Sequence, residues 1–242
     1  QAVGTVGKFY YASDGQIKFT PDGDLKQIIK YPHRKDDDIT GGIIIYESPY
    51  KNEKQQVPLN MYVICHDPYG QNQSADNTSL GAAYVIKRPN NLSQPDDIIA
   101  ASYVGRPKTQ DDYNRNLFIL ADYYGQEEFE MLDKRELRSK TVKRQYGMHM
   151  TEARKRQGEI YIRDWLNTVR SKDESGKQLL NLHKIYDPAL LTELIKFNHV
   201  GNFDRVMSLM VGMYHTRELY NAEVKDILED RATDKWFEQN YY

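Results

Sequence analysis

The chain has 242 residues, of which 39% are hydrophobic and 28% charged, and its formal net charge is −2. This composition is typical of a globular protein and disfavours disorder, and the length allows one large domain or two small ones. The near-zero net charge gives no overall case for nucleic-acid binding. The longest apolar runs fall far short of the roughly 18 to 20 residues that span a bilayer, so a soluble protein is expected. The single cysteine, Cys65, rules out an intrachain disulfide and favours a reducing compartment.

Short strands are predicted for the first part of the chain. A weakly alternating segment at 15–19 and a glycine-bounded strand within 41–50 form a strand-rich lead-in. Two apolar strands follow at 61–66 and 80–87. The segment 97–107 is a nearly continuous apolar run, which is typical of a central strand covered on both faces.

Helices are predicted for most of the second half. The clearest covers 109–125, where Thr109 and Asp112 have the spacing of a capping box and Gly125 is placed to end the helix. The segment 126–157 is helical by propensity and strongly charged, whereas 158–166 has an extended or mixed pattern.

Two more helices are predicted near the C-terminus. One covers 187–198, with Asp187 as N-cap and Pro188 at the first helical position. The other covers 202–220 and carries a buried stripe formed by Val206, Leu209, Met210 and Met213. The order of strands and helices predicts a layered α/β or α+β domain.

Two aspartates are candidates for a functional site. Asp67 ends the apolar strand 61–66, and a carboxylate there is costly unless it is solvated, paired or bound to a metal. Asp67 before Pro68 is equally consistent with the start of a turn. Asp204 lies in the first turn of an apolar helix, where an acid also complements the helix dipole. His66 precedes Asp67, and strand alternation predicts that the two side chains point to opposite faces.

Positive charge gathers in residues 134–156, which hold nine Lys and Arg against Glu136 and Glu152, a net charge of +7. One interpretation is a solvated helix face. The other is a patch that follows nucleic-acid phosphates on an otherwise acidic protein.

Several segments together resemble the nuclease domain of tailed-phage terminase large subunits, over roughly residues 40–220. They are "NMYVICHDPYG", "GAAYVIKR", "ASYVGRP", "FILADYYG" and "NFDRVMSLMVGM". The resemblance implies an α/β, ribonuclease H-like fold with a central mixed sheet flanked by helices. It assigns residues 41–220 to this nuclease domain, 1–40 to a lead-in of the same domain and 221–242 to a C-terminal tail.

The resemblance also implies site residues. Asp67 matches the family's first-strand metal ligand and Asp204 the acid of its C-terminal helix, so both are expected to be catalytic and metal-binding. Asp76 resembles an auxiliary acid that some members place in that loop. The acid that the family usually carries on a strand after the "FILADYYG" helix has no counterpart here. Either a stretch is missing between about Gly125 and Glu128, or Glu127 or Glu128 takes the role, or the domain is inactive.

The function implied by the resemblance is metal-dependent cutting of double-stranded viral DNA during genome packaging, with Mg²⁺ or Mn²⁺ and two ions in the site. The expected partners are DNA, the ATPase domain of the same full-length protein, the portal and the small terminase subunit, all in the host cytoplasm. Phosphate contacts are expected from Arg138, Lys143, Arg144, Arg154 and Arg156.

Other interpretations stay open. A catalytically silent DNA- or portal-binding module is the main alternative, and another enzyme on the same fold, such as a resolvase or transposase, is a third. "GTVGKF" (4–9) lacks the P-loop spacing, so no ATPase is expected in this chain.

Overall fold

The computed structural model describes residues 4–30, 38–58, 61–69, 79–88, 98–125, 150–198 and 201–217. The main sheet consists of β1 (Thr5–Tyr11), β2 (Ile17–Pro21), β3 (Ile43–Ile45), β4 (Tyr62–Asp67), β5 (Gly81–Lys87) and β6 (Ile98–Gly105). The helices are α1 (Gln110–Tyr123), α2 (Glu152–Leu166), α3 (Pro188–Lys196) and residues 204–217, called helix 204–217 below. A separate hairpin of β7 (Val169–Lys172) and β8 (Gln178–Leu180) leads into the 3₁₀ helix η2 (Asn181–Lys184).

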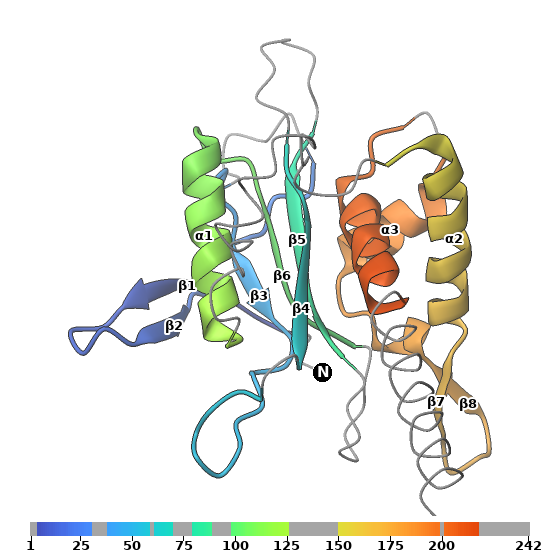
Figure 1. Cartoon of the computed structure of the whole chain (residues 1–242), viewed down its shortest axis with the longest axis horizontal. Coiled ribbons are helices and arrows are strands. Elements are labelled where there is room, and N and C mark those ends of the chain that lie inside the picture. The colour runs from blue at the N-terminus through green and yellow to red at the C-terminus, as the bar shows by residue number, and fades with distance from the viewer. Residues whose placement is uncertain are drawn as a thin grey trace, which may run out of the picture.

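The molecule has three layers, with α1 on one face of the sheet and α2, α3 and helix 204–217 on the other (Figure 1). The strand order is β2-β1-β3-β6-β5-β4. The expected α/β class with a helix-flanked sheet is therefore confirmed. The lead-in belongs to the same sheet, because β1 pairs with β3.

The expected mixed sheet is not found among the described strands, because each of their pairings is antiparallel. The physical reason is that β4, β5 and β6 follow one another directly and pair as neighbours, whereas a parallel neighbour needs a crossover connection. The ribonuclease H-like arrangement thus stays a proposal.

The prediction of an extended or mixed segment at 158–166 was wrong, because these residues belong to α2. Thr151 caps that helix by accepting a hydrogen bond from the Arg154 amide. Its buried residues Gly158, Ile162 and Trp165 are four and three positions apart, which is the helical period. The predicted helices at 109–125 and 187–198 are confirmed as α1 and α3, with Thr109 and Asp187 as their N-caps.

Strand β4 separates the two faces of the sheet. Tyr62 and Ile64 pack in the cluster beneath α1, whereas Cys65 packs against helix 204–217. Because side chains alternate along a strand, Asp67 shares the face of Cys65 and His66 the face of α1. The expectation that His66 and Asp67 point to opposite faces is confirmed, since the His66 ring lies 6.4 Å from that of Tyr113 on α1.

Helix 204–217 lies directly on β4 and β5. The hydroxyl of Ser208 donates to the carbonyl oxygen of Cys65 at 3.1 Å. At Gly212 a Cβ atom would come within 2.7 Å of the Cys65 sulfur, so a glycine is needed for this close approach. The predicted stripe of Val206, Leu209, Met210 and Met213 is buried against the sheet. The first turn of the helix is thereby brought to the end of β4.

Candidate active site at the end of strand β4

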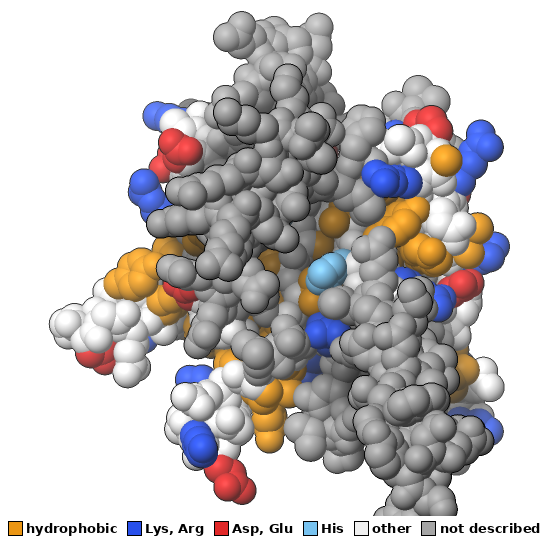
Figure 2. Space-filling view, viewed as in Figure 1, with side chains coloured by type: hydrophobic (Ala, Val, Ile, Leu, Met, Phe, Trp, Pro, Cys, Tyr) orange, Lys and Arg blue, Asp and Glu red, His pale blue; other side chains and the backbone are white. Residues whose placement is uncertain are grey.

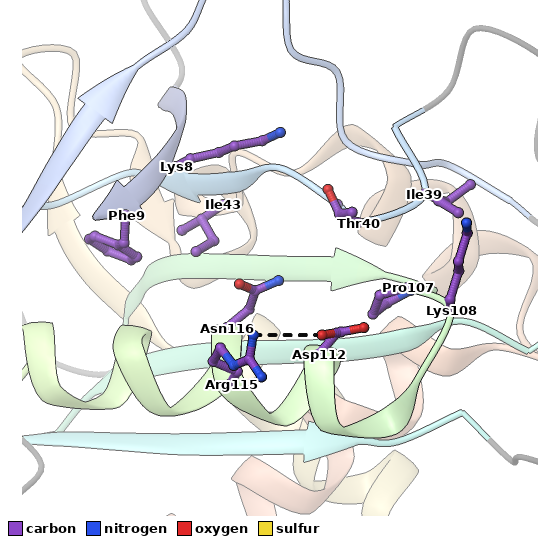
Figure 3. Close-up of a pocket in the computed structure, with 11 residues that line it drawn as sticks. Lys8, Phe9, Ile39, Thr40, Ile43, Pro107, Lys108, Asp112, Arg115 and Asn116 are labelled. Atoms are coloured by element: carbon purple, nitrogen blue, oxygen red, sulfur yellow. Dashed lines mark ion pairs between the residues drawn. The ribbon is translucent and has the colours of Figure 1, made fainter. Parts of the chain in front are cut away.

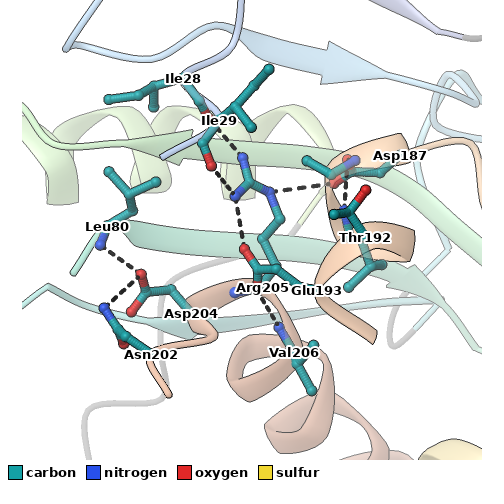
Figure 4. A network of polar contacts seen from close by, with 12 residues as sticks. Ile28, Ile29, Leu80, Asp187, Thr192, Glu193, Asn202, Asp204, Arg205 and Val206 are labelled. Carbon is teal, nitrogen blue, oxygen red and sulfur yellow. Dashed lines mark hydrogen bonds and ion pairs between the residues drawn. The ribbon is translucent and has the colours of Figure 1, made fainter. Parts of the chain in front are cut away.

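Asp204, the first residue of helix 204–217, is fixed to the start of β5. One of its carboxylate oxygens accepts a hydrogen bond from the backbone amide of Leu80 at 2.7 Å, and the other accepts from the hydroxyl of Ser79 at 3.0 Å. The side-chain amide of Asn202 lies 3.4 Å from the same carboxylate (Figure 4). Burial raises the pKa of Asp204, although these hydrogen bonds and the charges of Arg205 and Arg106 oppose the rise.

Asp67 ends β4 at the same edge of the sheet. It is paired in register with Ala82, two residues after Leu80. Burial raises its pKa to about 7, and the negative charges of Asp204 and Glu193 contribute to the rise. No hydrogen bond from the described residues to the Asp67 carboxylate offsets these effects. The structure therefore brings the two predicted aspartates into electrostatic contact, and Asp67 is the one whose ionisation is least compensated.

Glu193, on α3, is a third carboxylate of this region. Its two oxygens accept hydrogen bonds from the backbone amides of Arg205 and Val206 and from the Arg205 guanidinium. Burial raises the pKa of Glu193, and Arg205 opposes that rise. Sequence analysis missed this residue. The available signal was that Glu193 is the only acid within the apolar helix 188–196.

Arg205 lies at the centre of a polar network that joins three parts of this region (Figure 4). Its side chain is 1% exposed and pairs with Glu193 at 2.9 Å and, more distantly, with Asp187 at 3.8 Å. The guanidinium also donates to the carbonyl oxygens of Ile28 and Ile29 at 2.6 and 3.0 Å. One buried cation thus joins the lead-in, α3 and the helix that carries Asp204.

Arg106 forms a second support on the other side of Asp204. Its guanidinium donates to the carbonyl oxygen of Ser79 and lies over the ring of Tyr69, 5.1 Å from the ring centre. The hydroxyl of Tyr69 donates to the carbonyl oxygen of Pro107 at 2.8 Å. The segment after β6 is therefore connected to Asp204 through Ser79, and to Tyr69, two residues after Asp67.

The raised pKa of Asp67 has a consequence for stability. In the unfolded chain its pKa is about 3.9, so between about pH 4 and pH 7 the folded protein binds this proton more tightly, and stability falls as pH rises through that window. With divalent cations removed, we expect Asp67→Asn to leave the free energy of unfolding nearly unchanged at pH 4. At pH 8 it should raise that free energy by about 2 to 4 kcal/mol.

Urea unfolding at several pH values measures this effect. Asp164→Asn is a matched control, because Asp164 is an exposed residue of α2 that lies 3.5 Å from Arg217. The control should change stability by less than about 1 kcal/mol. If Asp67→Asn changes the free energy of unfolding by the same amount at pH 4 and pH 8, the pKa of Asp67 is not raised in the folded protein.

Only two of the remaining predicted residues are among those that the structure describes. Arg154 and Arg156 are exposed near the start of α2. On the face shown in Figure 2, the Lys and Arg side chains of the described residues on the α2 side of the molecule are spread among acidic and apolar ones. The other predicted site and phosphate-contact residues lie outside the described residues: Asp76, Glu127, Glu128, Arg138, Lys143 and Arg144. The tail 221–242 lies outside them too.

The donors present suit a hard divalent cation, because Asp67 and Asp204 supply carboxylate oxygens, the ligands that Mg²⁺ and Mn²⁺ prefer. Within the described residues, no group of three or more His, Cys, Asp or Glu is arranged to hold a metal ion. Asp67 and Asp204 alone would therefore supply only part of a coordination shell. Water, substrate phosphate or residues outside the described ranges would supply the rest.

Comparison with protein families, curated proteins and solved structures finds no match for this chain. Of the helices that the structure describes, none combines the length and apolar character needed to cross a bilayer.

Proposed function

We propose that the chain is a metal-dependent endonuclease domain that cuts double-stranded DNA, of the kind found in tailed-phage terminase large subunits, with a ribonuclease H-like arrangement. The observation that carries the proposal is that Asp67 and Asp204 lie at the same edge of the sheet. The carboxylate of Asp204 is bound to the start of β5, and burial together with the charge of Asp204 raises the pKa of Asp67 at the end of β4. The charge of Asp204 opposes the ionisation of Asp67, which burial already makes costly, and a bound cation would offset that cost.

In this mechanism Asp67 and Asp204 would hold the divalent cation, and Asp67 is the acid whose charge the protein compensates least. When bound, Mg²⁺ or Mn²⁺ supplies an activated water and stabilises the leaving oxygen of the phosphodiester. The protein contributes rigid geometry. Ser79 and Leu80 orient Asp204, while Arg205 fixes the helix that carries it.

Glu193 is proposed as a supporting acid rather than a direct ligand. Its oxygens already accept three hydrogen bonds from Arg205 and Val206. Its charge nevertheless increases the negative potential at Asp67 and so favours cation binding there. The proposed wider setting is genome packaging, with DNA, an ATPase domain of the same protein, the portal and the small terminase subunit as partners in the host cytoplasm.

A second candidate is a catalytically silent DNA- or portal-binding module. It is favoured by the absence, among the described residues, of a complete three-residue metal site. The two candidates differ in one observable, which is metal-dependent hydrolysis.

Cleavage of supercoiled plasmid by the purified chain tests the proposal. With Mn²⁺ or Mg²⁺ we expect nicked and then linear product, and EDTA should prevent both. If the plasmid stays intact with both metals although circular dichroism shows that the protein is folded, the nuclease proposal is contradicted. The catalytically silent binding module is then the better supported candidate.

A further inference from the structure

A pocket lies on the α1 face of the sheet, opposite to the face that Asp67 shares with Cys65. Its cavity volume is about 380 Å³, at the lower end of the range for ligand pockets. Its walls come from β1, β3, the segment after β6 and the first half of α1 (Figure 3). Phe9, Ile43 and Pro107 supply apolar surface, and cationic side chains enter from two sides.

The charged lining has a net positive balance. Lys8 comes from β1, Lys108 from the segment between β6 and α1, and Arg115 from the first half of α1. Lys8 lies 3.0 Å from Asp38 and is 57% exposed, and Arg115 lies 3.8 Å from Asp112 and is 71% exposed. Lys108 makes no ion pair or hydrogen bond with any residue that the structure describes. At least one cation of the pocket is therefore uncompensated within the described part of the chain.

The wall of the pocket is held in place by polar contacts. The side-chain amide of Asn116 donates to the hydroxyl of Tyr103 at 3.0 Å, and that hydroxyl donates to the carbonyl oxygen of Thr40 at 2.8 Å. These bonds join α1, β6 and the segment before β3. The cationic side chains are thus long, exposed groups on a fixed base, which suits binding of a phosphate without a large ordering of the backbone.

The pocket is connected to the acidic site. Pro107 belongs to its lining and accepts the hydrogen bond from Tyr69, two residues after Asp67. Arg106, the preceding residue, binds Ser79, which in turn binds Asp204. Lys108 directly follows these two residues, so it belongs to a segment that is tied to the same edge of the sheet as Asp67 and Asp204.

We propose that this pocket binds a backbone phosphate of the DNA strand. The choice of DNA as ligand rests on the proposed function, whereas the pocket and its charges do not. Contacts of this kind position the nucleic acid without reading its sequence. The predicted phosphate contacts from residues 134–156 leave this surface out, and sequence reasoning missed it because Lys8 and Lys108 are far apart in the chain.

Fluorescence anisotropy of a labelled DNA duplex, in EDTA so that no cutting occurs, tests the proposal with the full chain. Lys108→Ala and Arg115→Ala should each weaken binding at least about fivefold. Each should also reduce the slope of log affinity against log salt by about 0.9. Lys108→Arg, which keeps the charge, should retain binding.

Lys54→Ala is the matched control, because Lys54 is exposed in the loop that precedes β4 (Figure 1). Its affinity should stay within about twofold of the unsubstituted chain. Unchanged affinity and salt slope for both pocket variants would overturn the proposal. If AMP displaces the DNA when the two supply equal concentrations of phosphate groups, the proposal is also overturned, and the pocket binds a free nucleotide instead.

The two proposals fail separately. If the chain cuts plasmid and the pocket variants keep full DNA affinity, the nuclease proposal stands and the phosphate-pocket proposal is rejected. If the chain cuts no plasmid and Lys108→Ala weakens DNA binding, the phosphate-pocket proposal stands and the nuclease proposal is rejected.

Discussion

Asp67→Asn and Asp204→Asn are each expected to reduce metal-dependent plasmid cleavage more than about a hundredfold. Loss of residues that only support metal ligands costs about 10- to 100-fold, and loss of a ligand itself should exceed that range. Asparagine keeps the size of the side chain but removes the charge that attracts the cation. The measurement is the initial rate of nicking at saturating Mn²⁺, for folded protein.

Asp164→Asn is the control for both variants, since it removes the same charge from an exposed position on α2. Its nicking rate should stay within about twofold, because an exposed charge contributes little beyond its immediate surroundings. Cleavage by Asp67→Asn at the rate of the control would place the reaction elsewhere in the chain.

Arg205→Met is expected to lower the free energy of unfolding by about 3 to 5 kcal/mol. The substitution keeps the volume of the side chain but leaves the carboxylates of Glu193 and Asp187 without their buried cation. It also removes the donors of the Ile28 and Ile29 carbonyl groups. Urea unfolding at pH 7 gives the value.

Two further variants separate lost charge compensation from lost packing. Arg217→Met removes an arginine that is 49% exposed and pairs with Asp164, and should cost at most about 1 kcal/mol. Adding Glu193→Gln to Arg205→Met should recover about 1 to 2 kcal/mol, because one uncompensated carboxylate disappears. No recovery in the double variant would show that packing alone accounts for the loss.

Local patterns in the sequence predicted the elements that depend on local interactions. The N-caps Thr109 and Asp187 identified α1 and α3, and apolar runs identified β4, β5 and β6. The segment 158–166 was misread because Ile160 and Ile162 alternate with Tyr161, although burial follows the helical spacing of Gly158, Ile162 and Trp165. Tertiary packing decided that segment, as it often does where propensity is weak.

The candidate site was only partly accessible from sequence. Asp67 and Asp204 were identified individually, but their meeting depends on the contact of helix 204–217 with β4 through Ser208 and Gly212. Glu193 and Arg106 act through residues that are distant in the chain, so no local spacing marks them. The antiparallel order of the described strands is likewise a property of long-range pairing, which composition and periodicity leave open.

Binding of Mn²⁺ by the purified chain tests the central claim most directly, and the loss of the free-Mn²⁺ electron paramagnetic resonance signal during titration measures it without DNA. The account predicts that the unsubstituted chain and Asp164→Asn bind Mn²⁺, and that Asp67→Asn and Asp204→Asn lose at least about tenfold in affinity. Equal Mn²⁺ affinity in all four proteins would contradict the claim that Asp67 and Asp204 together hold the cation.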